Sequence, residues 1–389
     1  MARVDRGEGT IAYLGVLLLV AGVVGAVAVS GVGGKVTEAC ADAICRVVGG
    51  ECAAPAAGTA EGAGRPVSRL RTGGGAATPS PRPSARPPVR EPVCKPDPEG
   101  RIPWVDRLHA HNDYENRNPL ADALDNGATS VEVDVFQERD GTLSIRHDRN
   151  NDARHLILRE QYLSYLALRA QQNGGEIYPG RSEPFEVFIE FKEGGADAYA
   201  QLIREMTTTR PPLPPDVRLV LPMPEKPIFD PVANTLGGEP IPANVTFSKG
   251  FEIRRDANDR PYCVLPEQLD ATRPGYDPRI ASRVTVLNGK FGDCLRNDGD
   301  EFRINPAERD RFGALVRRAH GSGHRVRIWG GPDGRQRRDF GTFWPCVRGD
   351  KCKGELRDGW WRTVLDTGVD YLVTDHLTRG SQWLRNCGS

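Results

Sequence analysis

The stretch SVEVDVF, residues 130–136, reads as a single β-strand. Side chains alternate between the two faces of a strand, so the three valines share one face and Glu132 and Asp134 share the other. Two enclosed carboxylates need a cation or a cationic side chain beside them. The stretch therefore predicts a strand whose valines face helices and whose carboxylates point into a closed sheet. The alternative is a surface E-x-D on an edge strand.

Similar short apolar runs recur between residues 105 and 374 and alternate with helical patterns. One such pattern, PLADALDNG at residues 119–127, has Pro in its first turn and Gly just past its end, as a short helix requires. This alternation predicts an α/β fold, a (β/α)8 TIM barrel, with active residues at the carboxyl ends of its strands. Nine runs compete for eight positions, so at least one is wrong or lies outside the barrel. The runs are 105–110, 130–136, 143–146, 185–191, 218–221, 245–247, 283–287, 325–329 and 371–374.

Two segments precede the predicted barrel domain, which spans residues 94–389. Residues 1–34 include an uncharged apolar run from 9 to 34, long enough to cross about 30 Å of hydrocarbon as a helix. It is either a retained membrane anchor or a cleaved signal peptide. Residues 35–93 form a cysteine-containing stalk and a linker rich in Pro, Ala, Gly and Arg, which we expect to be disordered. The barrel domain is therefore expected outside the cytoplasm, either membrane-anchored or secreted.

Cysteine usage fits that location. Six of the nine cysteines lie in the predicted barrel domain, enough for three disulfides in an oxidising compartment. Cys346 and Cys352 are close enough in sequence to close a small loop. Cys94 and Cys387 could join the two ends of the domain.

Histidines stand at the ends of two predicted strands. In LHAHNDY, residues 108–114, His109 and His111 share a face, and H-x-H is a frequent metal-ligand spacing. Two histidines in one site can also divide acid and base duties, as phosphodiester cleavage requires. His147 ends the run LSIRH, 15 residues after Glu132.

A fourth run, EVFIEFK at residues 186–192, adds charge to the same predicted interior. Alternation places Glu190 and Lys192 on one face. Glu190 can act as a third carboxylate ligand for Mg2+ or Ca2+. Lys192 can neutralise a phosphate oxygen or a transition-state charge. The alternative is a surface strand whose Glu and Lys side chains face solvent.

Taken together, HNDY at 111–114, E-x-D at 132–134, HD at 147–148 and EFK at 190–192 resemble the phosphatidylinositol-phospholipase-C-like phosphodiesterase superfamily. That superfamily includes the glycerophosphodiester phosphodiesterases, and the run GVDYLVTD at 368–375 is similar to their last barrel strand. The overall likeness, over about residues 103–380, is closest to the branch named for an "altered inheritance of mitochondria" protein. The usual H-R-G opening is absent, and Ala110 or Asn112 stands where a phosphate-binding arginine is expected.

The resemblance implies a metal-dependent phosphoric diester hydrolase acting on a phospholipid or glycerophosphodiester. Trp329 either lines the substrate cleft or packs in the barrel. The implied roles are His111 and His147 as general base and general acid, His109 as an alternative to or partner of His111, Glu132, Asp134, Glu190 and Asn112 as ligands of one Mg2+ or Ca2+, and Lys192 as a charge stabiliser.

Other functions compete with this one. An amidohydrolase- or PHP-type hydrolase also uses H-x-H on a first barrel strand, but it needs further histidine ligands on later strands. A non-catalytic or toxin-like extracytoplasmic module, tethered by the N-terminal helix, is a third possibility. The chain carries 52 Lys+Arg and 52 Asp+Glu, and this zero net charge argues against nucleic-acid binding.

Overall fold

The computed structural model describes residues 95–150, 154–181, 183–295, 304–333 and 350–388. Within these ranges, eight strands form one parallel path in the order β14-β13-β10-β6-β5-β2-β1-β15. They are β1 (Leu108–Ala110), β2 (Ser130–Gln137), β5 (Phe185–Glu193), β6 (Val217–Pro222), β10 (Val245–Gly250), β13 (Val284–Lys290), β14 (Arg325–Trp329) and β15 (Leu372–Thr374).

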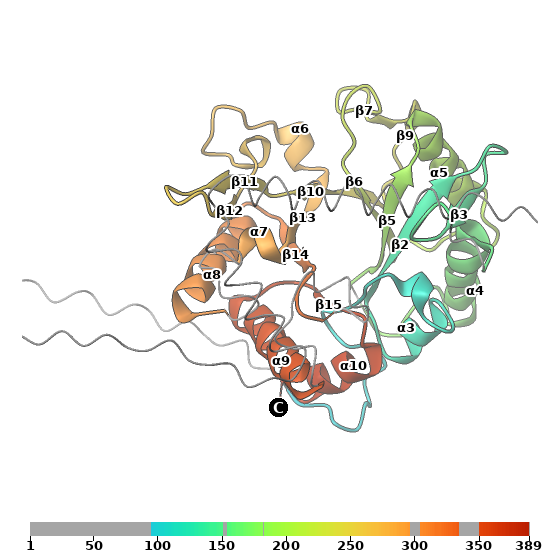
Figure 1. Cartoon of the computed structure of the whole chain (residues 1–389). Helices are drawn as coiled ribbons and strands as arrows, with labels where there is room; N and C mark the ends of the chain where they lie inside the picture. The colour runs from blue at the N-terminus through green and yellow to red at the C-terminus, as the bar shows by residue number, and fades with distance from the viewer. Residues whose placement is uncertain (1–94, 151–153, 182, 296–303, 334–349, 389) are drawn as a thin grey trace, which may run out of the picture. The chain divides into compact units, whose positions relative to one another are not determined.

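The two ends of this path lie next to each other. Strands β14 and β15 meet at a single parallel bridge between Arg327 and Tyr371. The Asp370 amide, just before β15, also donates to the Val326 carbonyl at 3.0 Å. Figure 1 shows the strands around a common centre with the helices outside them. The predicted α/β class is confirmed, and the end strands share one bridge rather than a full ladder.

Each of the nine predicted runs forms a strand, and the surplus one lies off the main path. It is β3 (Leu143–Ile145), which pairs antiparallel with β2 and with β4 (Leu156–Ile157). The chain turns back on β2 through Asp140-Gly141, where Gly141 has φ +90°. A tight turn of this kind leaves no room for the crossover helix that a parallel neighbour would need.

The larger helices surround the strands (Figure 1). The first follows the predicted pattern, because it ends just before Gly127, which has φ +80°. An Asn305–Glu308 capping box begins α8. The helices are α3 (Ala121–Asp125), α4 (Ser164–Gln172), α5 (Ala196–Thr208), α6 (Pro278–Ala281), α7 (Phe291–Cys294), α8 (Pro306–Gly321), α9 (Asp350–Thr367) and α10 (Leu377–Arg385), with a π-turn η2 (Arg159–Leu163) and 3-10 turns η1 (Asp113–Glu115) and η3 (Glu267–Leu269).

The apolar core has two parts, one on the outer face of the sheet and one on its inner face. The large cluster contains the three β2 valines with side chains from the helices, so these valines face outward as predicted. The small cluster consists of Phe188, Val220, Val286, Tyr371 and Val373 from four strands of the ring. Buried charged side chains, among them Glu132, Asp134 and Arg327, also lie on this inner face.

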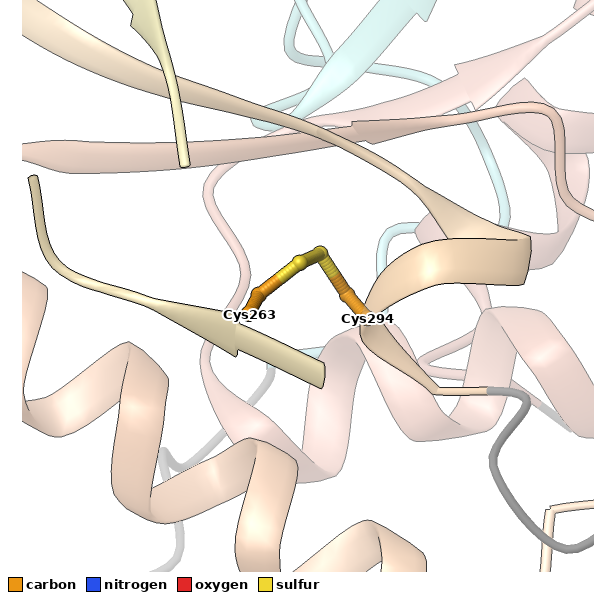
Figure 2. The surroundings of a disulfide bond; sticks show 2 residues. All are labelled: Cys263 and Cys294. Carbon is orange, nitrogen blue, oxygen red and sulfur yellow. A yellow bond between two sulfur atoms is a disulfide. The ribbon is translucent and has the colours of Figure 1, made fainter. Parts of the chain in front are cut away.

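Short strands lie in the loops that follow β6 and β10. They are β7 (Phe229–Asp230), β8 (Thr235–Leu236), β9 (Glu239–Pro240), β11 (Glu252–Arg255) and β12 (Pro261–Val264). A disulfide between Cys263 on β12 and Cys294 at the end of α7 fixes the β11–β12 hairpin to the loop after β13 (Figure 2). Cys387 is also disulfide-bonded. Cys94 and Cys346 lie outside the described residues, so the two predicted pairings stay predictions.

The predicted N-terminal segments, residues 1–34 and 35–93, also lie outside the described residues. No helix in the described ranges combines the length and the apolar character that a membrane span requires.

Candidate active site

The predicted polar residues occur near the carboxyl ends of neighbouring strands. In the β2–β5 ladder, Asp134 lies directly opposite Glu190. His147 follows the end of β3, which pairs with β2. The other predicted residues are His109 on β1, His111 just after it, Glu132 on β2 and Lys192 on β5.

His111 is bound at one ring nitrogen by a carboxylate that follows β15. Its Nδ1 donates to Asp375 Oδ1 at 2.7 Å. Its Nε2 lies 3.5 Å from Glu132 Oε2. Burial opposes charging of the ring, but Glu132 and Asp375 outweigh it and raise the pKa of His111 to about 9. The ring is therefore oriented by Asp375, with Nε2 directed toward the site.

Asp134 organises the second histidine. Its Oδ2 accepts from Tyr114 Oη at 2.7 Å and from His147 Nδ1 at 3.1 Å. This hydrogen bond to Asp134 is the main cause that raises the pKa of His147. The side chain of His147 is 43% exposed, so a substrate can reach the ring. His147 thus repeats the arrangement of His111, with Nδ1 on a carboxylate.

Lys192 connects the two carboxylates on β2 and β5. Its Nζ lies 3.1 Å from Asp134 Oδ2 and 3.0 Å from Glu190 Oε1. Burial opposes its charge, while Asp134 and Glu190 raise the pKa of Lys192 overall. Lys192 therefore keeps a positive charge beside His147.

His109 occupies a different layer from His111. It is fully buried, and its ring packs edge-on against Phe188 and Tyr371. Burial, and then the charge of Arg327, hold the pKa of His109 well below its usual value. A neutral ring at this depth serves orientation rather than proton transfer, so the structure separates the two histidines of the H-x-H pair.

Arg327 compensates the other β2 carboxylate. Its Nη2 lies 2.7 Å from Glu132 Oε2, and both side chains are almost completely buried. Both β2 carboxylates thus have a cationic neighbour, as the sequence required. These neighbours are Arg327 for Glu132, and Lys192 together with His147 for Asp134.

The metal prediction can be tested against the donor atoms. Asp134 Oδ1 and Glu132 Oε2, the latter ion-paired with Arg327, are buried carboxylate oxygens that accept no hydrogen bond. Such oxygens fit the preference of Mg2+ or Ca2+. Glu190 is 48% exposed and paired with Lys192, and the described residues contain no group of three His, Cys, Asp or Glu side chains placed to hold a metal. Glu132 and Asp134 therefore suit a cation, and the full ligand set stays a prediction.

Two further predicted residues lie at the edge of this arrangement. Asn112 is half-buried and adopts a left-handed backbone conformation with φ 43°, which turns the chain into η1. Trp329, at the end of β14, is 37% exposed and lies under the Lys290 ammonium, with Nζ 5.6 Å from the ring centre. Trp329 is therefore not fully packed in the barrel interior, and its lining of a substrate cleft stays a prediction.

Two of the later histidines, His320 and His324, lie at the opposite end of the strands. His320 Nε2 pairs with Asp370, the residue two before β15, at 2.8 Å. His324 Nδ1 contacts the carbonyl of Val284, the first residue of β13, at 2.9 Å. Neither is placed to complete the histidine set that an amidohydrolase-type site would need.

Sequence reasoning assigned no role to Tyr114, Arg327 or Asp375. A signal existed for Asp375, since alternation from Tyr371 through Val373 directs it to the interior. Arg327 lies two residues before Trp329 on the same strand, so the two side chains point to the same face. Nothing in the local sequence showed which distant residues they would meet.

Comparisons with known proteins agree with the motifs. Residues 104–211 match a family model described as the AIM6-like phosphodiesterase domain. The predicted resemblance is confirmed. The AIM6-like segment contains the strands β1 to β5 and eight of the nine predicted site residues, which are His109, His111, Asn112, Glu132, Asp134, His147, Glu190 and Lys192.

Individual relatives extend beyond that segment. The chain is 27% identical over 310 residues to altered inheritance of mitochondria protein 6 of Eremothecium gossypii, covering 72% of this chain and 70% of that protein. The protein of the same name from Lachancea thermotolerans is 25% identical over 297 residues, covering 70% and 64%. A solved glycerophosphodiester phosphodiesterase from Parabacteroides distasonis is 13% identical, with a TM-score of 0.40 over 73% of this chain and 100% of that one.

Proposed function

We propose that this chain is a phosphoric diester hydrolase of phospholipids or glycerophosphodiesters, built on a (β/α)8 barrel. The observation that carries the proposal is the pair His111 and His147. Each has its Nδ1 on a carboxylate, Asp375 or Asp134, and each has its Nε2 on the side of the ring away from that carboxylate. The AIM6-like phosphodiesterase match over this segment supports it.

Paired histidines suit cleavage of a phosphodiester because two protons must move. One Nε2 takes the proton of the attacking oxygen, and the other Nε2–H gives a proton to the departing alkoxide. The carboxylate at each Nδ1 fixes the tautomer and stabilises the imidazolium form. Lys192, beside Asp134, lies where it can offset the charge that develops on the phosphoryl oxygens.

A divalent cation is part of the proposal. Glu132 and Asp134 would hold Mg2+ or Ca2+, with Glu190 and Asn112 as the further ligands that the resemblance implies. When bound, such an ion supplies Lewis-acid stabilisation of phosphoryl charge. The proposed setting is extracytoplasmic, with the N-terminal segment acting as anchor or signal. Fractionation of cells and alkaline extraction of membranes would test that setting.

The function is tested with the purified full chain, stripped of metal by a chelator. Hydrolysis of bis(4-nitrophenyl) phosphate, a glycerophosphodiester and phospholipid vesicles is measured with Mg2+, with Ca2+ and with neither. His111→Ala is expected to lower turnover by about 10²- to 10⁴-fold. His320→Ala is the matched control, since it removes a carboxylate-paired histidine from the opposite end of the strands. Full activity in His111→Ala, or an equal loss in His320→Ala, would contradict the proposal.

A further inference from the structure

Arg327 is a buried cation on the floor of the candidate site. It lies in the middle of β14, and its side chain is only 2% exposed. Its guanidinium lies over the Phe188 ring, with 5.3 Å between the guanidinium carbon and the ring centre. A guanidinium retains its charge at any accessible pH, so a permanent positive charge is built into the interior of the ring.

Two neutral partners fix the orientation of this guanidinium. Its Nε donates to His109 Nε2 at 3.2 Å, and its Nη1 donates to Asn288 Oδ1 at 3.1 Å. His109 is itself held by Ser130, with 2.8 Å between Nδ1 and Oγ. Because the arginine Nε can only donate, the ring proton of His109 lies on Nδ1. The neutral His109 thereby positions Arg327 in the interior of the ring.

The third nitrogen of the guanidinium has no hydrogen-bond partner. Nη2 lies 2.7 Å from Glu132 Oε2, yet both atoms are buried without a hydrogen bond between them. This contact is an ion pair, and because Nη2 carries two hydrogens, one carboxylate oxygen can satisfy at most one of them, which leaves at least one buried N–H without an acceptor. Glu132 Oε2 is also 3.5 Å from His111 Nε2, which places the unpartnered N–H groups next to the reactive edge of His111. Buried N–H groups that lack an acceptor are rare in folded proteins.

We propose that Arg327 is the phosphate-binding residue of this site and donates from Nη2 to a non-bridging oxygen of the substrate phosphate. The proposal rests on the phosphodiesterase function proposed above. The opening motif of this chain lacks the phosphate-binding arginine that the resemblance predicts, because Ala110 or Asn112 stands at its position. Arg327 would supply that guanidinium instead. In this chain the guanidinium comes from β14, across the ring from β2. Planar donors suit phosphate oxygens better than the point charge of a lysine.

The test measures binding of inorganic phosphate to the full chain by calorimetry, beside kcat/KM for a phosphodiester. Arg327→Lys keeps the charge but loses the contacts to His109 and Asn288. Its phosphate affinity is expected to fall at least about tenfold and its kcat/KM about 10²-fold. Asn288→Ala keeps the guanidinium and loosens it, and a smaller loss of both quantities is expected.

Arg325→Lys is the matched control. Arg325 lies on the same face of the same strand, but it pairs with Glu186 in the layer below, at 2.7 Å between Nη1 and Oε2. Its phosphate affinity should equal that of the wild type. Thermal melts identify folded variants, so a loss of affinity is not mistaken for unfolding.

The outcomes separate the two proposals. Folded Arg327→Lys with wild-type phosphate affinity, an equal loss in Arg325→Lys, or a wild-type chain that binds no phosphate would overturn the role of Arg327. A wild-type chain that binds phosphate through Arg327 but hydrolyses no phosphodiester would support that role and defeat the phosphodiesterase function instead.

Discussion

Replacing Asp375 with Asn tests how the histidine pair is held. The Asp375 carboxylate is 9% exposed and accepts from His111 Nδ1 at 2.7 Å. A hydrogen bond between a charged carboxylate and a buried donor contributes about 1.5–3 kcal/mol. At about 1.4 kcal/mol per tenfold change, kcat should fall about 10- to 150-fold. An asparagine amide can also donate to Nδ1 and so favour the wrong tautomer, which adds to the loss.

The assay compares kcat for one phosphodiester in Asp375→Asn and in Asp370→Asn. Asp370 provides a control because it also binds a histidine, His320, with 2.8 Å between Oδ2 and Nε2, but at the other end of the strands. Asp370→Asn should lower stability and leave kcat within about twofold. A wild-type kcat in Asp375→Asn would refute the orienting role, and so would an equal loss in both variants.

Three further predictions follow from single contacts. Tyr114→Phe removes both hydroxyl contacts of that side chain, to Asp134 and to His147, and should lower kcat by about tenfold in steady-state assays with little change in KM. Glu186→Gln removes the negative charge and one of the two acceptor oxygens that bind two arginines and a tyrosine, and urea unfolding should show a loss of about 3 kcal/mol with kcat nearly unchanged. Mutating Cys263 and Cys294 together to serine opens a loop of 31 residues, and the midpoint of chemical unfolding should shift by the equivalent of about 3–4 kcal/mol.

The strands and the inward direction of the β2 carboxylates could be predicted because both depend on local pattern. Alternation of valine with Glu132 and Asp134 specifies the two faces of the strand independently of the rest of the chain. The pairing of β3 with β2 also depends on local sequence, since the turn at Asp140-Gly141 is encoded in two adjacent residues.

The cross-ring contacts could not be predicted, because they depend on how the ring closes. His111 meets Asp375 across 264 residues, and Arg327 meets His109 across 218. These side chains come together because β14, β15 and β1 are neighbours in the ring. Likewise, H-x-H shows that two histidines share a face, but it does not show that they occupy different layers. A spacing of two residues along a strand is about 6.6 Å, which separates a buried orienting ring from one at the site.

Substrates with different leaving groups test whether the two histidines divide the proton transfers between them. Turnover of His111→Ala and of His147→Ala is measured on an alkyl phosphodiester and on bis(4-nitrophenyl) phosphate, with wild-type chain beside them. Departure of an alkoxide needs a proton, whereas 4-nitrophenolate is stable enough to leave without one. We predict that both variants lose the alkyl substrate and that only one of them, the variant lacking the general acid, retains substantial activity on the nitrophenyl ester. Wild-type turnover of the alkyl substrate by either variant would contradict the two-histidine site.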